Sequence, residues 1–193
     1  MTEIRFSGFG GQGIIRCGLI TGKALSLFDN KHATMTQSFG PEARGSACSS
    51  QLVVSEERVL YPYITQPEIL IAMSQEAYDK YEPHLRKDGI LIIDEDLVNP
   101  NPPRDKIKLF SVQSTRIAEE LGNRIIGNLV MLGFFTAVTS VVSPDAMKKA
   151  LPGLVPERFL DLNIKGFEKG YEVGLQATGK KSVKTKNKQG VAK

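Results

Sequence analysis

The sequence is poor in the side chains that bind metals. It contains two cysteines, Cys17 and Cys48, which form no C-x-x-C, and two histidines, His32 and His84. Iron–sulfur clusters and structural zinc sites need several clustered ligands. We therefore expect this chain to hold no iron–sulfur cluster, no zinc and no other metal. The two cysteines are interpreted as small buried hydrophobic residues in a reducing compartment.

Targeting and membrane signals are also missing. The first residues, Met-Thr-Glu-Ile-Arg, lack the pattern of a signal peptide, which predicts a cytoplasmic protein. One apolar stretch, residues 125–142, reaches the lower limit of length for a membrane span. It contains Asn128 and further polar residues, so we expect a buried helix that forms core and subunit interface.

The positive charge of the chain is confined to its end. The net charge is +4, and residues 178–193 hold six lysines and no acid, so that without them the charge becomes −2. A segment with so little to bury should be a disordered, solvated tail with no nucleic-acid or membrane partner, and such a partner is the alternative for its lysines. The 193 residues are enough for one domain with a sizeable core, and residues 1–177 are predicted to form it.

The order of apolar runs predicts an α/β fold. Residues 68–73 and 89–94 are continuous apolar runs, typical of strands buried on both faces of a parallel sheet. They alternate with patterns of helical spacing, which favours a doubly wound, Rossmann-like, mostly parallel sheet with C-terminal helices. Further strands are expected at 4–6, 32–38, 46–55 and 106–110, and helices at 12–28, 75–81, 115–121, from Ser143 onward, and 156–176.

A glycine-rich turn follows the first predicted strand. Four glycines occur within six residues, and an apolar pattern with helical spacing then begins at Ile14. A strand, a tight glycine turn and a helix N-terminus together favour an anion, usually a phosphate, and the spacing matches the dinucleotide fingerprint G-x-G-x-x-G. The candidate cofactor-binding residues are Gly8, Gly10, Gly11, Gln12 and Gly13.

The fingerprint is incomplete. It requires an acid at the end of the second strand, to hold a ribose hydroxyl, and that end reads Gln37-Ser38-Phe39-Gly40. Asp29 falls before this strand, where it is expected to end the first helix. A phosphate or dinucleotide-like ligand and simple close packing of helix on strand both remain open, and NAD is disfavoured.

A second glycine-bearing segment follows the second strand. Ligands of such sheets bind at the carboxyl ends of the strands, and Gly8–Gly13, Gln37–Gly45 and Ser74–Glu76 should gather there. Hydrogen bonding at caps and strand ends is the alternative for Gln37, Ser38 and Gln75, and an exposed ion pair is the alternative for Glu42 and Arg44. The candidate residues for a partner or ligand loop are Gln37, Ser38, Gly40, Pro41, Glu42, Arg44 and Gly45.

These two glycine motifs, in this order, resemble the gamma subunit of 2-oxoacid:ferredoxin oxidoreductases. Segments 60–64, 70–78 and 89–94 extend the likeness, which covers roughly residues 3–176. The stretch Met73-Ser-Gln-Glu-Ala-Tyr78 and the small size are most similar to the 2-oxoglutarate branch.

The resemblance implies a division of labour among subunits. The reaction is the oxidative decarboxylation of a 2-oxoacid to acyl-coenzyme A with thiamine diphosphate, and electrons pass to iron–sulfur clusters. This chain has no thiamine-type Gly-Asp-Gly…Asn motif and no cluster cysteines. Alpha and beta catalytic subunits and a ferredoxin-like delta subunit would then carry these cofactors.

The same resemblance gives this chain a docking role without catalytic residues or activity of its own. The glycine turn would either receive a phosphate of coenzyme A or simply meet the catalytic subunits closely. Arg44 would bind an anion or carboxylate of a partner, with Glu42 as its counter-charge. Two other hypotheses are a self-sufficient Rossmann oxidoreductase that binds NAD or FAD, and an assembly scaffold with no ligand.

Overall fold

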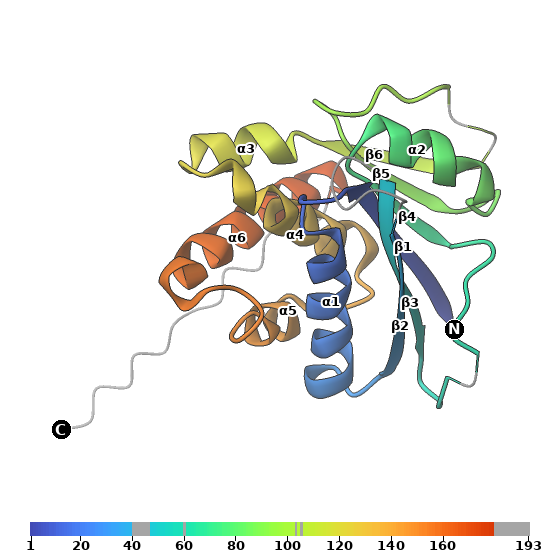
Figure 1. The fold of residues 1–193 in the computed structure, drawn as a ribbon, viewed down its shortest axis with the longest axis horizontal. Helices are drawn as coiled ribbons and strands as arrows, with labels where there is room; N and C mark the ends of the chain where they lie inside the picture. The colour runs from blue at the N-terminus through green and yellow to red at the C-terminus, as the bar shows by residue number, and fades with distance from the viewer. Residues whose placement is uncertain (40–46, 60, 103, 105, 180–193) are drawn as a thin grey trace.

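A computed structural model of the chain describes residues 1–39, 47–59, 61–102, 104 and 106–179. A six-stranded sheet carries helices on both faces (Figure 1). The strands are β1 (Thr2–Phe9), β2 (His32–Ser38), β3 (Ala47–Ser55), β4 (Ile69–Ala72), β5 (Ile90–Asp94) and β6 (Lys108–Val112). The α-helices are α1 (Ile14–Phe28), α2 (Gln75–Tyr81), α3 (Ser114–Glu120), α4 (Gly127–Thr139), α5 (Pro144–Ala150) and α6 (Leu160–Ala177).

The sheet is mostly parallel, as predicted. Its strand order is β2-β3-β1-β4-β5-β6. The pairs β1–β4, β4–β5 and β5–β6 are parallel, whereas β3 runs antiparallel to both of its neighbours, β1 and β2. Residues 39–46 alone connect β2 to β3, and a parallel crossover needs a dozen residues or more. The chain therefore returns antiparallel at this point.

Each face of the sheet has its own core. Helices α1, α4, α5 and α6 lie on one face, where Phe6 and Ile71 pack in a large cluster with Phe135. On the other face a smaller cluster under α2 contains Leu70 and Leu91. Ile71 and Leu70 are neighbours in β4 yet belong to different clusters, so the apolar run of β4 is buried on both faces, as the sequence predicts.

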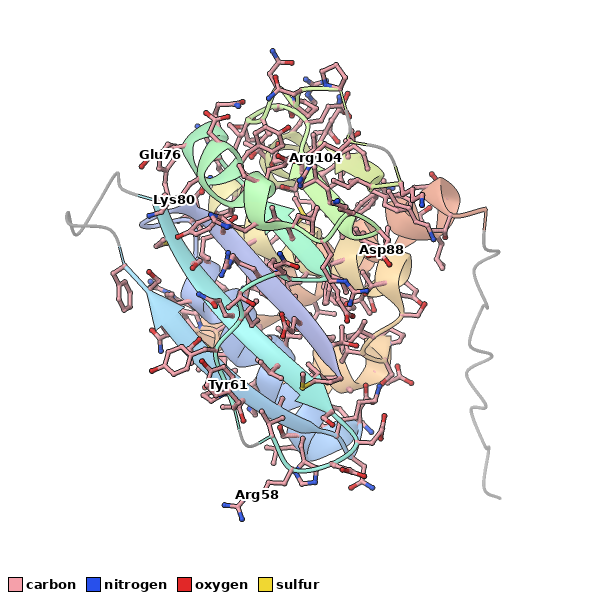
Figure 2. All side chains as sticks on the ribbon, turned by 90° about the vertical axis from the view of Figure 1, so that its right-hand side faces the viewer. Arg58, Tyr61, Glu76, Lys80, Asp88 and Arg104 are labelled. Carbon is pink, nitrogen blue, oxygen red and sulfur yellow. The ribbon has the colours of Figure 1, made fainter. Side chains whose placement is uncertain are left out.

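The second face is only partly covered by helix. Figure 2 shows α2, with Glu76 and Lys80, on the side of β4 and β5. Tyr61 lies lower on this face, and its side chain is 68% exposed. Its ring centroid is 5.7 Å from that of Tyr63. The segment that carries these tyrosines therefore takes the place of a helix over the β2–β3 part of the sheet.

Helix α4 is the most deeply buried helix among the described residues. Its buried residues run without a break from Gly127 to Val138, and α6 packs directly against it. The prediction that this helix forms core is confirmed, and its burial comes from this chain's own elements. Its predicted role in a subunit interface stays a prediction. Across the described residues, no helix combines the length and the apolar character that crossing a membrane would require.

Several element ends differ from the prediction because the backbone turns left-handed. Helix α1 begins at Ile14 rather than Gln12, since Gly11 and Gly13 have φ of 102° and 77°. Helix α4 ends at Thr139, since Ser140 has φ of 53°. Strand β6 follows Lys106, whose φ is 75°. Each left-handed residue breaks the repeating dihedral angles that the element needs.

The start of α5 follows the predicted cap. The Ser143 hydroxyl accepts a hydrogen bond from the Ala146 amide at 3.2 Å, and Pro144 is the first helical residue. Asp29, at the end of α1, accepts from the Ser143 amide and hydroxyl at 2.6 Å each. Asp29 thus ends α1, as expected, and also joins it to the start of α5.

Candidate functional site

The predicted stretches meet at one edge of the sheet. Ser7 of β1 pairs with Ala72 of β4, so the glycine turn and Ser74 leave neighbouring strand ends. The Ala47 amide, at the start of β3, donates to Glu76 Oε1 at 3.3 Å. Among the described residues the predicted gathering is confirmed. Gly40, Pro41, Glu42, Arg44 and Gly45 lie outside the described residues.

Gln12 connects the ends of β1 and β4 through its side chain. Its Oε1 accepts from the Phe9 amide at 2.6 Å, and its Nε2 donates to the Met73 carbonyl at 2.8 Å. A Cβ at Gly8 would lie 2.4 Å from this Oε1. Gly8 is therefore needed to make room for Gln12, and the amide fixes the shape of the turn.

Gly13 accommodates a residue from a distant helix. It adopts the left-handed conformation at the start of α1, and a Cβ there would lie 2.3 Å from Asn128 Nδ2. Gly8 and Gly13 thus support the packing interpretation of the fingerprint. Gly11 is different, because it is exposed and a Cβ there would meet no atom within 4 Å.

The start of α1 favours negative charge. No side chain caps it, and its first turn contains no acid. The first amides of a helix lack partners within the helix, and the helix dipole places its positive end there. An anion beside Gly11 would satisfy both features.

A cavity of about 260 Å³ opens beside this turn. Its walls come from the segments that follow the parallel strands and from the start of α4. Met73 and Asn128 are its buried residues with side chains, whereas Ile125 is 76% exposed. The lining residues are Gly11, Gln12, Met73, Leu97, Thr115, Arg124, Ile125, Gly127 and Asn128. This is the position at which open α/β sheets bind ligands.

The cavity is lined by one buried polar side chain, Asn128, and by the partly buried Thr115. Asn128 is 4% exposed, and its Oδ1 has no hydrogen-bond partner in the described part of the chain. The Thr115 hydroxyl donates to Asp94 Oδ2 at 2.9 Å, which leaves the hydroxyl oxygen free to accept. Asp94 is fully buried and also accepts from the amides of Thr115 and Asp96, each at 3.0 Å, and from the Ser114 hydroxyl.

Sequence reasoning found only part of this site. It identified the glycine turn, and it singled out Asn128 as a polar interruption of an apolar stretch, but it missed Thr115 and Arg124. The lone amide in an otherwise apolar helix was the available signal for Asn128. The contact with Gly13 could not be anticipated, because it depends on how α4 packs against α1.

Other predicted residues have structural partners. Ser74 caps α2 by accepting from the Ala77 amide at 3.3 Å. Gln75 donates to Asp79 at 2.8 Å and accepts from the Asn99 amide at 2.7 Å, so the hydrogen-bonding alternative holds for this residue. Gln37 and Ser38 are exposed at the end of β2.

The cysteines are part of the core. Both are buried and free. Burial raises the pKa of the Cys17 thiol from its ordinary value of 9.0 to about 12, and burial also raises the pKa of Cys48. The interpretation of both as small hydrophobic residues is confirmed. Within the described residues, no group of three or more histidine, cysteine or acidic side chains is placed to hold a metal.

Comparison with known proteins identifies relatives along nearly the whole chain. Residues 3–173 match the family model for pyruvate ferredoxin/flavodoxin oxidoreductase. A 2-oxoglutarate synthase subunit KorC from Methanocaldococcus jannaschii is 47% identical over 176 residues, which are 90% of this chain and 94% of that protein. A pyruvate synthase subunit PorC from Methanothermobacter marburgensis is 29% identical over 175 residues, 89% of this chain and 97% of that protein.

Two solved structures share the fold. The gamma subunit of a keto/oxoacid ferredoxin oxidoreductase from Geobacter sulfurreducens is 41% identical, with a TM-score of 0.80, over 91% of this chain and 99% of that one. A 2-oxoglutarate:ferredoxin oxidoreductase from Magnetococcus marinus, with 2-oxoglutarate, coenzyme A and succinyl-CoA bound, has a TM-score of 0.82 at 22% identity. The match covers 91% of this chain and 31% of that chain.

Proposed function

This chain belongs to the pyruvate ferredoxin/flavodoxin oxidoreductase family as a gamma subunit, and we propose that its complex converts 2-oxoglutarate, coenzyme A and an oxidised acceptor to succinyl-CoA, carbon dioxide and the reduced acceptor. The choice of 2-oxoglutarate as the substrate rests on sequence identity. This chain is 47% identical to the KorC protein and 29% identical to the PorC protein, over nearly equal lengths.

The redox cofactors of this reaction belong to other subunits in our proposal. Thiamine diphosphate would be held by alpha and beta catalytic subunits, and iron–sulfur clusters by a ferredoxin-like delta subunit. The two cysteines are buried, and in the part of the chain that the structure describes no three histidine, cysteine or acidic side chains come together as metal ligands, which supports that division. The chain shapes and completes the complex and is inactive alone.

The glycine turn is the proposed contact with coenzyme A. The exposed Gly11 and the uncapped start of α1 offer amides and a positive dipole end to a phosphate. Gly8, Gly10 and Gly13 shape the turn, and Gln12 fixes it through its two hydrogen bonds. Coenzyme A is the phosphate-bearing substrate of the proposed reaction.

The segment after β2 is the proposed contact with a catalytic subunit. Gln37 and Ser38 are exposed at the sheet edge that also carries the glycine turn. In this proposal Arg44 binds an anion or carboxylate of the partner and Glu42 is its counter-charge. Gly40, Pro41 and Gly45 belong to the same proposed contact.

A scaffold without any ligand is the second candidate function. It is favoured by one observation: the space above Gly8 and Gly13 is filled by Gln12 and Asn128 of the chain itself. The same observation speaks against NAD or FAD at this turn, because a dinucleotide needs close approach to those glycines. Calorimetric titration with NAD or FAD should therefore show no micromolar binding.

The substrate proposal is tested with the assembled complex. The chain is co-expressed with its partner subunits, and ferredoxin reduction is measured with coenzyme A and each of three acids, 2-oxoglutarate, pyruvate and 3-methyl-2-oxobutanoate. We expect co-purification and the highest kcat/KM with 2-oxoglutarate. A higher kcat/KM with pyruvate would contradict the proposed substrate while leaving the subunit role intact.

A further inference from the structure

We propose that strand β2 pairs with β2 of a second copy of this chain, in an antiparallel arrangement centred on Met35 that joins the two six-stranded sheets into one. The exposed Phe39 of each copy would then enter a cavity beside Lys31 of the other. This interface goes beyond the proposed function, and it does not depend on which acid the complex converts.

Strand β2 is an edge strand with an open backbone. It stands first in the strand order and pairs only with β3 (Figure 2). Among the described residues, no backbone hydrogen bond outside this pairing involves residues 32–38. Its outer N–H and C=O groups are therefore a template to which another extended strand can add.

The devices that usually protect an edge strand are absent from β2. Natural edges are blunted by lysine, by proline or by a bulge, or they are kept very short. Residues 32–38 contain no lysine, arginine, acid or proline. The strand is seven residues long, and its pairing with β3 continues residue by residue from His32 to Ser38 without a bulge. Such an edge is suited to pairing rather than to exposure.

The sequence of β2 is complementary to itself. A pairing centred on Met35 is the register in which all seven residues find a partner within the strand. Thr34 then comes opposite Thr36 of the second copy, and Ala33 comes opposite Gln37. Threonine pairs across strands are favourable, and no like charges meet. This match within one sequence identifies a second copy, related by two-fold symmetry, as the partner.

The same register brings an exposed aromatic residue to a cavity. Phe39 follows β2 and is 69% exposed. Counted outward from Met35, it comes opposite Lys31 of the second copy. A cavity of about 430 Å³, larger than a phenyl ring, opens there. Ala33 and Val59 contribute apolar surface to its lining, and the methylene groups of Lys31 add to it.

Helix α1 adds apolar surface beside the paired strands. A Cβ at Gly18 would lie 3.1 Å from Met35 Sδ, so α1 passes directly over β2. Leu19 is 44% exposed and belongs to no core cluster among the described residues. Ser26, seven residues later and so on the same side of α1, lines the cavity beside β2. Leu19 of both copies would therefore lie over the joined strands.

This pairing is compatible with the proposed contact to a catalytic subunit. It uses the backbone edge of β2, whereas the side chains of Gln37 and Ser38 alternate between the two faces of the sheet. Residues 40–45, which carry that other contact, follow the paired strand in the sequence.

Disulfide cross-linking tests the register, in the full chain and in the complex co-expressed with its partner subunits. Met35→Cys places two cysteines opposite each other, about 4.5–5.5 Å apart, which a disulfide can span. Thr34→Cys alone should not cross-link, because its copy is a diagonal neighbour at about 7–8 Å. An equal mixture of Thr34→Cys and Thr36→Cys chains should cross-link again. The wild type, with two buried cysteines, gives the background.

Sedimentation equilibrium of the same preparations measures the association. We expect a dimer of the full chain and two copies of it in the complex. Phe39→Ala should raise the dimer Kd at least about tenfold, because each dimer loses two buried phenyl rings. Phe159→Ala is the matched control, since Phe159 is also exposed, at 36%, but precedes α6. It should leave the Kd within twofold.

Three results would overturn the proposal. One is a monomeric chain together with a complex that holds a single copy. Another is a dimer in which neither Met35→Cys nor the mixed threonine variants cross-link, which excludes this register. The third is a cross-link from Met35→Cys to a catalytic subunit, which shows that a strand of that subunit covers the edge. Cross-linking between copies together with the weaker Phe39→Ala dimer supports the interface.

Discussion

At the scale of single residues, the glycines of the turn perform different tasks although one motif contains them all. Gly8 gives space to Gln12, Gly13 gives space to Asn128, and Gly11 leaves an open surface. A glycine-rich pattern in a sequence predicts that a ligand or another part of the protein lies close to the backbone. It does not reveal whether the approaching group is a ligand or a side chain of the same protein.

Cys17 provides a residue-scale prediction for alkaline pH. Burial keeps its thiol neutral in the folded state, with a pKa raised from 9.0 to about 12, whereas the unfolded chain ionises near the ordinary value. Between these values the folded state binds more protons, so the free energy of unfolding falls as pH rises, by at most about 1.4 kcal/mol per pH unit from this group.

Urea denaturation at pH 8 to 10.5 checks this effect by comparing the wild type with Cys17→Ala. The difference in unfolding free energy between the two proteins should stay constant below pH 8.5 and shrink at higher pH as the wild type loses this contribution. A difference that is independent of pH over the whole range would show that Cys17 ionises equally in both states.

At the scale of elements, helices α4 and α6 pack with their backbones in direct contact. An added Cβ at Gly170 would lie 1.9 Å from the Val130 carbonyl oxygen, and one at Gly133 would lie 1.9 Å from the Phe167 carbonyl oxygen. The two backbones therefore touch, which lets Phe134 and Phe167 fill the core below the sheet. Because the obstacles are backbone atoms, they cannot turn aside as a side chain would.

Gly170→Ala should for this reason destabilise the protein by about 1–3 kcal/mol or more, since the helices must separate. Gly22→Ala is the matched control within helix α1, where an added Cβ would meet only the flexible Leu52 Cδ2, at 3.3 Å. Its effect should stay below about 1 kcal/mol. Chemical denaturation of both variants measures the difference, and equal stability of the two would contradict the proposed close contact.

Sequence predicts these elements well where a single local signal decides them. The His32–Ser38 and Gln75–Tyr81 boundaries are confirmed, and so is the Ser143 cap. The start of α1 was placed too early because a left-handed glycine cannot be distinguished by composition from a glycine inside a helix. The small residues at Gly166, Gly170 and Gly174 gave no indication of their partner helix, since that depends on tertiary packing.

At the scale of the whole molecule, the fold places the cavity at the edge of the sheet where the carboxyl ends of the parallel strands meet. The cavity is formed by segments that follow β1, β4, β5 and β6, and by α4. The class of fold and the edge of the sheet could be predicted from the apolar runs. The identity of the cavity residues could not, because Asn128 and Thr115 reach this edge only through the packing of the C-terminal helices.

The most direct measurement of the central claim is a reconstitution of ferredoxin reduction by 2-oxoglutarate and coenzyme A. The purified chain is assayed alone, the other subunits are assayed without it, and the two preparations are then combined. The account predicts no turnover by the chain alone and full coenzyme A-dependent turnover only in the mixture. Turnover by the isolated chain, or a flavin or cluster that stays bound to it after purification, would contradict the account.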